Sequence, residues 1–388
     1  MERFLNVMRP ILLLLLISGS VFTHAQKNQQ ILHTNVKAFR IKISDDDPKT
    51  VRTWRIAPEV KPDTCFSTGK EVRFITDIDS LTIRVSKKKP AVDFIVIYNR
   101  KDTCYTHVQF VETPDYLGKL KQAKKYNSGD LRPLPEFTYQ DSGDAHLKAL
   151  REKYNLDSIA GEASEIHQML NLMHWIHNLV EHDGQHGNPD VKNADNMIQA
   201  CSDGSRGLNC RGLAISLNEC FLALGFQSRY ITCMPKETNF DDCHVINMVY
   251  SRDLEKWIYL DPTNDAYVMD EKGMLLSIQE VRDRLINGKP LLLNPGANWN
   301  NEEACLPESY LYSYMAKNLY RLQCPVSSEY DYETKLPGKN TVYIELLPLD
   351  GLNQNPQKSE SVDPGLNFTI TNYVTNNPAL FWKAPVIR

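Results

Sequence analysis

Two different patterns of hydrophobic positions divide this sequence. Between residue 27 and about residue 142, short β-branched or aromatic runs with partial alternation are separated by polar turn clusters, which is typical of strands. These runs are AFRIKI, EVRFITDI, LTIRVS, DFIVIYN and CYTHVQFVE. A segment rich in Gly, Pro and Asp follows over residues 126–144. We therefore predict a β-rich N-terminal domain over residues 26–142.

From residue 143 the hydrophobic residues recur with helical spacing. The runs HLKALREKYNL and SEIHQMLNLMHWIHNLVEH predict two helices. A further helix is predicted from Cys210, with Asn209 as its N-cap and Gly225 at its C-terminal end. Its apolar stripe consists of Leu213, Ala214, Leu217, Phe221 and Leu224. Three strands follow, SRYITCMP, CHVINMVY and KWIYLDPT, so we predict an α+β core over residues 143–300.

The rest of the chain continues this mixture of elements. SIQEVRDRLING predicts a helix that ends at Gly288, and YLYSYMAKNLYRLQ predicts another helix. NTVYIELL predicts a strand, whereas the polar run NQNPQKSESVDPGLN predicts a loop. We expect residues 301–388 to form a C-terminal extension that packs on the core.

The N-terminus has the features of an export signal. Arg3 and Arg9 supply positive charge, the apolar run PILLLLLI follows, and small residues then lead to Ala25. This apolar run is far shorter than the roughly 20 residues that a membrane span needs, and no other long apolar stretch follows. We predict a signal peptide over residues 1–25 with cleavage near Ala25, a secreted or periplasmic location, and no stable membrane span.

Composition and motifs argue against several classes of function. The formal net charge of -4 and the pI of about 6.2 give no electrostatic footprint for nucleic acid. No phosphate-binding glycine loop or dinucleotide motif is present, so we expect no cofactor. Histidines cluster at His174, His177, His182 and His186, but they lack the Cys-containing spacing of structural zinc sites. We therefore expect no metal.

The chain contains 9 cysteines, all after the signal segment. Exported proteins can form disulfides. If Cys210 stays a free thiol, the pairs to test first are Cys65 with Cys104 and Cys305 with Cys324. The alternative, which we favour slightly, is that most of the cysteines are reduced and buried as small apolar side chains.

Cys210, His244 and Asp261 form the strongest candidate site. Cys210 begins a predicted helix, whose peptide dipoles stabilise a thiolate. His244 begins one predicted strand and Asp261 ends the next. A turn centred near Arg252 and Asp253 places them opposite one another, with about 5 Å between their Cβ atoms. We predict that the thiol attacks a carbonyl, the imidazole transfers the proton, and the carboxylate fixes the imidazole tautomer.

The segments GLNCRGLA, CHVINMVY and WIYLDPT resemble the three signature segments of the transglutaminase-like superfamily. The resemblance covers about residues 165–268. It implies a papain-related core, in which the catalytic Cys begins a helix that packs on an antiparallel sheet carrying the His and the Asp. It also implies a secreted, bacterial-type member in which the three residues above form the triad. The chain differs from the common pattern in two places. An aromatic residue is frequent shortly after the His, where Val245, Ile246 and Asn247 follow here, and an acid is frequent just after the Cys, where Arg211 stands.

Acyl transfer also requires hydrogen-bond donors for the oxyanion. The orphan backbone N–H groups in the first turn of the helix that begins at Cys210 are candidates. Asn209, Trp175 and His182 are the candidate side chains for this role or for lining the cleft, although the position of Trp175 on a helix also fits the core.

These observations predict an exported cysteine-dependent acyl-transfer enzyme that hydrolyses amide or peptide bonds. Its expected partner is a peptide or protein substrate, with cell-wall peptides and glycans as further candidates, and the β-rich domain is expected to position it. Two alternatives stay open. One is a non-catalytic protein- or glycan-binding module on the same scaffold, and the other is a true amine-transferring transglutaminase.

Overall fold

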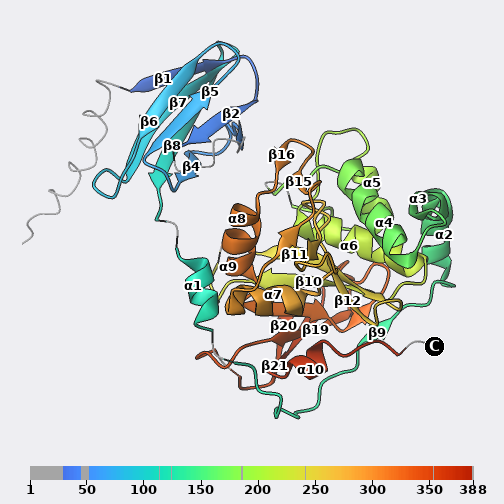
Figure 1. Ribbon diagram of the computed structural model, residues 1–388. Coiled ribbons are helices and arrows are strands. Elements are labelled where there is room, and N and C mark those ends of the chain that lie inside the picture. Colours follow the sequence, from blue (N-terminus) through green and yellow to red (C-terminus); the bar gives the residue numbers. More distant parts are fainter. Residues whose placement is uncertain are drawn as a thin grey trace, which may run out of the picture. The chain divides into compact units, whose positions relative to one another are not determined.

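The computed structural model describes residues 29–44, 52–112, 114–123, 125–184, 187–240, 242–352 and 354–386 (Figure 1). The predicted signal peptide and its cleavage site lie outside these residues. The chain divides into two compact units, Met1–Thr113 and Pro114–Arg388. Within the described ranges, no helix has both the length and the apolar character that crossing a membrane requires.

The described part of the first unit is a sandwich of two four-stranded sheets, with the orders β1-β7-β8-β4 and β3-β2-β5-β6. Alternate residues point into the space between the sheets, where Phe74 meets Phe94 with ring centroids 4.9 Å apart. The predicted β-rich N-terminal region is thereby confirmed. The strands are β1 (Gln30–Thr34), β2 (Ala38–Ile43), β3 (Arg52–Arg55), β4 (Asp63–Ser67), β5 (Glu71–Ile75), β6 (Ser80–Arg84), β7 (Ala91–Tyr98) and β8 (Asp102–Phe110).

Three of these strands, β1, β3 and β4, were not predicted from the sequence. Each lies at an edge of its sheet, and each is only four or five residues long. Short strands at a sheet edge offer few alternating positions, so their hydrophobic pattern is weak.

The second unit is built on a seven-stranded sheet with the order β12-β11-β10-β17-β19-β21-β20. Neighbouring strands are antiparallel except β19 and β21, which are parallel. The strands, in chain order, are β10 (Ser228–Met234), β11 (His244–Ser251), β12 (Lys256–Leu260), β17 (Arg321–Pro325), β19 (Asn340–Leu346), β20 (Lys358–Asp363) and β21 (Phe368–Thr375).

Two hydrophobic cores lie on opposite faces of this sheet, because alternate residues of β11 point to opposite sides. Val245 and Val249 share one core with the helices α2 (Ala145–Lys153), α3 (Leu156–Ala160), α4 (Glu165–Leu179), α5 (Ala194–Ala200) and α6 (Cys210–Ala223). Ile246 and Met248 share the other core with α1 (Tyr116–Lys121), α7 (Ile278–Asn287), the π-helix η1 (Tyr310–Met315), α9 (Ala316–Asn318) and α10 (Pro378–Phe381).

Short elements complete the second unit. The helix α8 (Pro307–Ser309) precedes η1. Three two-stranded ladders link loops: β9 (Thr138–Tyr139) with β18 (Ser327–Ser328), β13 (Val268–Met269) with β14 (Leu292–Leu293), and β15 (Asn298–Trp299) with β16 (Glu303–Ala304).

The structure corrects two predicted domain boundaries. The division falls at residue 113 rather than 142, because residues 114–142 belong to the second unit: Leu120 of α1 lies in its core, and β9 pairs with β18. Residues 301–388 are not an extension that packs on the core. They supply β17, β19, β20 and β21, four of the seven strands of the central sheet.

Two further elements differ from their predictions. The run NQNPQKSESVDPGLN is not only a loop, since it contains β20, whose residues are exposed or half-buried at the sheet edge. YLYSYMAKNLYRLQ is not one α-helix. It begins as η1, passes into the short α9, and its last residues start β17. By contrast, α7 has the predicted C-terminal Gly288, with φ of 63°, and begins with a capping box between Ser277 and Glu280.

All nine cysteines lie within the described residues, and all nine are free thiols. Neither Cys65 with Cys104 nor Cys305 with Cys324 forms a disulfide. Cys65 and Cys104 are instead buried in the core of the sandwich, as expected for the small apolar role of a reduced cysteine.

Candidate active site

Cys210 is the first residue of α6, and Asn209 is the N-cap of that helix. The Asn209 Oδ1 accepts hydrogen bonds from the backbone N–H groups of Arg211, at 3.0 Å, and Gly212, at 3.2 Å. The Nδ2 of Asn188 donates to the same oxygen at 2.8 Å. Asn209 therefore positions the thiol through the backbone, and its oxygen serves the helix rather than a substrate.

His244 and Asp261 form a buried pair. The His244 Nε2 lies 2.7 Å from the Asp261 Oδ2, and the residues are 2% and 0% exposed. Their register differs from the prediction. β11 and β12 pair Asn247 with Leu260, so Asp261 follows beside Ile246 and reaches His244 diagonally on the same face of the sheet. Since Nε2 is bound to the carboxylate, Nδ1 is the nitrogen that remains for the thiol of Cys210.

Asp261 is the centre of a hydrogen-bond network. Its Oδ2 accepts from the Tyr310 hydroxyl at 2.6 Å and from the Asn264 Nδ2 at 2.9 Å, and its Oδ1 accepts from the backbone N–H of Thr263 at 2.9 Å. The hydroxyls of Tyr310 and Tyr259 lie 2.5 Å apart. Burial raises the pKa of Asp261, but the charge and hydrogen bond of His244, followed by the hydrogen bonds from Tyr310 and Asn264, outweigh it and hold the pKa below the ordinary value.

The electrostatics of the site favour a thiolate beside an imidazolium. Burial raises the pKa of Cys210, but hydrogen bonds from His182 and His244 and the electrostatic effect of both rings outweigh it and lower the pKa from 9.0 to about 6. Burial lowers the pKa of His244, but the charge and hydrogen bond of Asp261, followed by Cys210, raise it to about 10. The attraction between Cys210 and His244 contributes to both shifts, while His182 adds to the first and Asp261 is the larger cause of the second.

Two tyrosines of η1 belong to the site and were not identified from the sequence. Tyr310 donates to Asp261, and Tyr314 packs edge-on against His244 with ring centroids 5.2 Å apart. The Tyr314 hydroxyl donates to the backbone oxygen of Cys243 at 3.4 Å. The only trace of this arrangement in the sequence is the spacing of four residues between the two tyrosines, which puts them on one side of a helix.

The other predicted side chains separate into two groups. His182 lies at the site, since its backbone forms a bridge with Leu208, two residues before Cys210, and its ring lowers the pKa of the Cys210 thiol. Trp175 instead packs against Tyr154 in the helical core, with ring centroids 5.7 Å apart, as its position on α4 allowed.

Two of the clustered histidines, His174 and His177, connect α4 to the loops that follow Asp261 and precede β16. His174 binds the Asp265 carboxylate at 2.8 Å, and the two ring nitrogens of His177 each lie 3.0 Å from an oxygen of Pro262 or Asn298. His186 lies outside the described residues. Within the described ranges, no group of three or more His, Cys, Asp or Glu side chains has the arrangement of a metal site.

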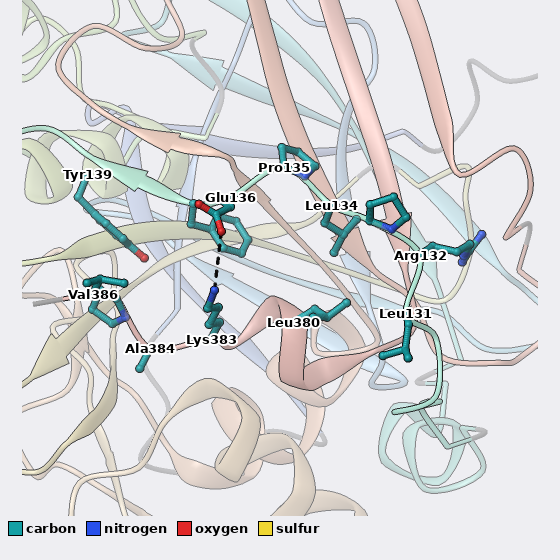
Figure 2. A pocket seen from close by; sticks show the side chains of 13 residues that line it. Leu131, Arg132, Leu134, Pro135, Glu136, Tyr139, Leu380, Lys383, Ala384 and Val386 are labelled. Carbon is teal, nitrogen blue, oxygen red and sulfur yellow. Dashed lines mark ion pairs between the residues drawn. The ribbon is translucent and has the colours of Figure 1, made fainter.

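A separate cavity of about 280 Å³ lies between residues 131–139 and residues 380–386. Figure 2 shows its lining, in which Lys383 and Glu136 face each other at 4.0 Å. Leu131, Leu134, Pro135 and Leu380 contribute apolar walls. None of the predicted site residues lines this cavity, so it is no part of the cysteine site.

Comparison with known proteins agrees with the resemblance found in the sequence. Residues 152–262 match a family model described as the transglutaminase-like superfamily. No curated protein matches the chain significantly. Among solved structures, a candidate cysteine protease from Cytophaga hutchinsonii is similar at 20% identity over 40% of this chain and 50% of that chain, with a TM-score of 0.26. This TM-score is too low for that likeness to bear on fold or activity.

The fold and the site define an α+β protein in which a cysteine begins a helix beside a buried His–Asp pair. The segment that matches the transglutaminase-like superfamily model, residues 152–262, contains Cys210, His244 and Asp261. The match supports a cysteine-dependent kind of enzyme. It spans under a third of the chain, so it leaves the activity of the whole protein to be proposed.

Proposed function

We propose that the protein is an exported cysteine-dependent acyl-transfer enzyme that hydrolyses amide or peptide bonds through Cys210, His244 and Asp261. The observation that carries the proposal is the buried His244–Asp261 pair, with His244 Nε2 2.7 Å from the carboxylate, whose imidazole lowers the pKa of Cys210 at the start of α6. This is the arrangement in which a thiolate and an imidazolium stabilise each other near neutral pH.

The reaction follows from the protonation states. The Cys210 thiolate attacks the carbonyl carbon, and the carbonyl π electrons move to oxygen. The His244 imidazolium gives its Nδ1 proton to the leaving nitrogen, the C–N bond breaks, and an amine leaves behind a thioester. A water molecule then attacks the thioester while giving a proton to His244, and cleavage of the C–S bond releases the acid and restores the ion pair.

Asp261 has a supporting role in this mechanism. It accepts from His244 Nε2–H, so the ring keeps the orientation that presents Nδ1 to the sulfur. Its negative charge also stabilises the imidazolium that the resting pair contains and that deacylation restores. Tyr310 and Asn264 keep the carboxylate ionised by donating to its Oδ2.

The proposal also includes a substrate class and a location. A family of thiol enzymes of this kind favours a peptide or protein as substrate, and cell-wall peptides carry the same amide bond. Export rests on the charged and apolar N-terminal residues that end near Ala25. N-terminal sequencing of the protein recovered outside the cytoplasm is expected to begin at Gln26, and an intact Met1 on that material would contradict export.

The activity is tested by incubating the purified protein with a peptide library and with cell-wall peptides, with methylamine as a second acceptor, and reading the products by mass spectrometry. Hydrolysis predicts new carboxyl ends, which Cys210→Ala abolishes. Cys201→Ala is the matched control, because Cys201 is also a partly exposed thiol and lies at the end of a helix.

Each other result has a defined meaning. Methylamine adducts in place of acids would replace hydrolysis by amine transfer. Binding of peptides or glycans without new products, together with slow and uniform alkylation of all thiols, would replace the enzyme by a binding module.

A further inference from the structure

The start of α6 offers a substrate only one backbone donor. The Asn209 N–H is bound to the Asn188 Oδ1 at 3.0 Å, and the N–H groups of Arg211 and Gly212 are bound to the Asn209 Oδ1. The N–H of Cys210 has no acceptor among the described residues. One donor is a weak oxyanion site, since such sites combine two or more preorganised donors.

The backbone of His182 is fixed close to the start of this helix. His182 forms a parallel bridge with Leu208, two residues before Cys210. The bridge is supported by the bond from Asp183 N to Leu208 O, at 2.7 Å, and by the bond from Leu208 N to Glu181 O, at 3.1 Å. The loop that carries His182 therefore runs beside the residues that lead into the nucleophile.

The hairpin of β15 and β16 fixes the position of His182 and selects its tautomer. Asn300 accepts from the His182 N–H at 2.7 Å and donates to the His182 carbonyl oxygen at 3.0 Å. The Trp299 Nε1 donates to the His182 Nδ1 at 3.2 Å. Because an indole nitrogen can only donate, Nδ1 must be the unprotonated nitrogen, and the ring proton lies on Nε2. The hairpin is outside the segment that matches the superfamily.

The two histidines at Cys210 thus have different partners. His244 is bound to a carboxylate, which favours the charged ring that a proton-transfer group requires. His182 accepts from an indole N–H at Nδ1, which leaves Nε2 as the nitrogen that can donate. The first can exchange a proton with the substrate, and the second can only offer a hydrogen bond.

We propose that His182, held in its Nε2–H tautomer by Trp299, is a second catalytic histidine that donates a hydrogen bond to the oxyanion formed when Cys210 attacks a carbonyl. The Cys210 N–H is the other donor. As the S–C bond forms and the carbonyl π electrons move to oxygen, both donors bind the new charge, and no proton is transferred by His182. This inference rests on the proposed function and assigns Trp299 as its positioning residue.

The experiment compares two reactions of the same sulfur in the full chain. Acylation by p-nitrophenyl acetate develops an oxyanion and is followed by release of nitrophenolate. Alkylation by iodoacetamide develops none and is followed at Cys210 by peptide mapping. Rates are taken on the high-pH plateau of each profile, because loss of the His182 hydrogen bond also shifts the pKa of the thiol.

We expect His182→Ala to lower the plateau acylation rate by about 10²–10³-fold, the usual effect of removing one oxyanion donor, and the plateau alkylation rate by less than about threefold. His182→Gln, which keeps an N–H donor, is expected to recover acylation to within about tenfold of wild type. Trp299→Phe removes the indole donor and is expected to lower acylation by about tenfold, because both tautomers then become populated.

Equal losses of acylation and alkylation in His182→Ala would overturn the inference and leave His182 as a partner of the thiolate only. Unchanged acylation would overturn it as well. If His182→Ala does not fold, judged by circular dichroism, His182→Gln and Trp299→Phe decide the matter, since failure of Trp299→Phe to change the acylation rate contradicts the tautomer assignment. Wild-type acylation in Cys210→Ala would instead refute the proposed function itself.

Discussion

The two faces of the seven-stranded sheet contribute to the candidate site in different ways. On one face α6 brings Cys210 to a largely apolar core that includes Val245 and Ile258. On the other face, Tyr259 and η1 pack against the side of β11 that carries Ile246. His244 points to the same side of β11 as Ile246, because the two residues are two positions apart on the strand. The thiol and its imidazole therefore come from opposite faces and meet where β11 begins.

The comparison shows two ways of fixing a reactive group. The thiol is placed by backbone geometry, since Asn209 caps the helix that Cys210 begins. The imidazole is placed by side chains, since Asp261 orients it and Tyr310 in turn supports the carboxylate. Substitutions on the helical face should therefore lower the stability of α6. Substitutions on the opposite face should instead shift the pKa values of the site residues.

The largest effect is expected from His244→Gln. The substitution removes the group that protonates the leaving nitrogen and activates water, so acyl transfer should fall by about 10⁴-fold or more. The thiol also loses one of the two hydrogen bonds that lower its pKa, so the midpoint of its alkylation profile should move up from about 6. Both changes are measured with p-nitrophenyl acetate turnover and iodoacetamide labelling.

His167→Gln is the matched control, because His167 lies on α4 and hydrogen-bonds Ser164 rather than a site residue. It should leave both measurements unchanged. Wild-type turnover in His244→Gln would mean that the face of the sheet that carries His244 contributes no catalytic group. The contrast between the two faces would then be wrong.

Asp261→Asn is expected to have the next largest effect, about 10³–10⁴-fold on turnover, because the tautomer and charge of His244 are no longer favoured. The pH dependence of turnover shows the direction in which the His244 pKa moves. In the wild type the reactive pair exists above the lowered thiol pKa, about 6, and is lost as pH rises through the raised His244 pKa, about 10. Without the carboxylate the His244 pKa falls, so the alkaline limb should move to lower pH. An alkaline limb that stays in place would show that Asp261 does not control the imidazolium.

Local chemistry in the sequence marks each of the three candidate residues. Cys210 follows an Asn cap and precedes an apolar helical stripe, and Gly225 ends that helix with φ of 82°. His244 and Asp261 stand at the ends of alternating β-branched and aromatic runs. Each of these signals lies within a few residues of the group that it identifies.

The parts that were missed depend on distant contacts or on turn geometry. Tyr310 reaches Asp261 from 49 residues along the chain, through a π-helix that no spacing rule distinguishes from an α-helix. The predicted hairpin register was wrong because Ser251 pairs with Lys256, which leaves a four-residue turn in which Glu255 has a φ of 50°. This register places Asp261 beside Ile246 rather than opposite His244.

A smaller effect is expected from Tyr310→Phe. The substitution removes one of the donors to Asp261 and leaves the Tyr259 hydroxyl without that partner, so turnover should fall by about tenfold, the range of one hydrogen bond to a charged group. The Asp261 pKa should rise, so turnover should also become more sensitive to acid. Tyr312→Phe is the control, since Tyr312 lies on the same π-helix but only packs against the core. Equal losses in the two variants would point to disturbed packing of η1 instead.

The smallest effect on turnover is expected on the helical face, from Asn209→Ala. Loss of the N-cap should lower the free energy of unfolding by about 0.5–2 kcal/mol, measured by urea denaturation. Asn193→Ala offers a close comparison, because Asn193 caps α5 by accepting from the Asn196 N–H and should give a similar stability loss. Only Asn209→Ala should also slow p-nitrophenyl acetate turnover, by about threefold to tenfold, since Cys210 then leaves its position beside His244. Equal turnover in the two variants would mean that packing, rather than the cap, fixes the thiol, and the contrast between the two faces would then lose its physical basis.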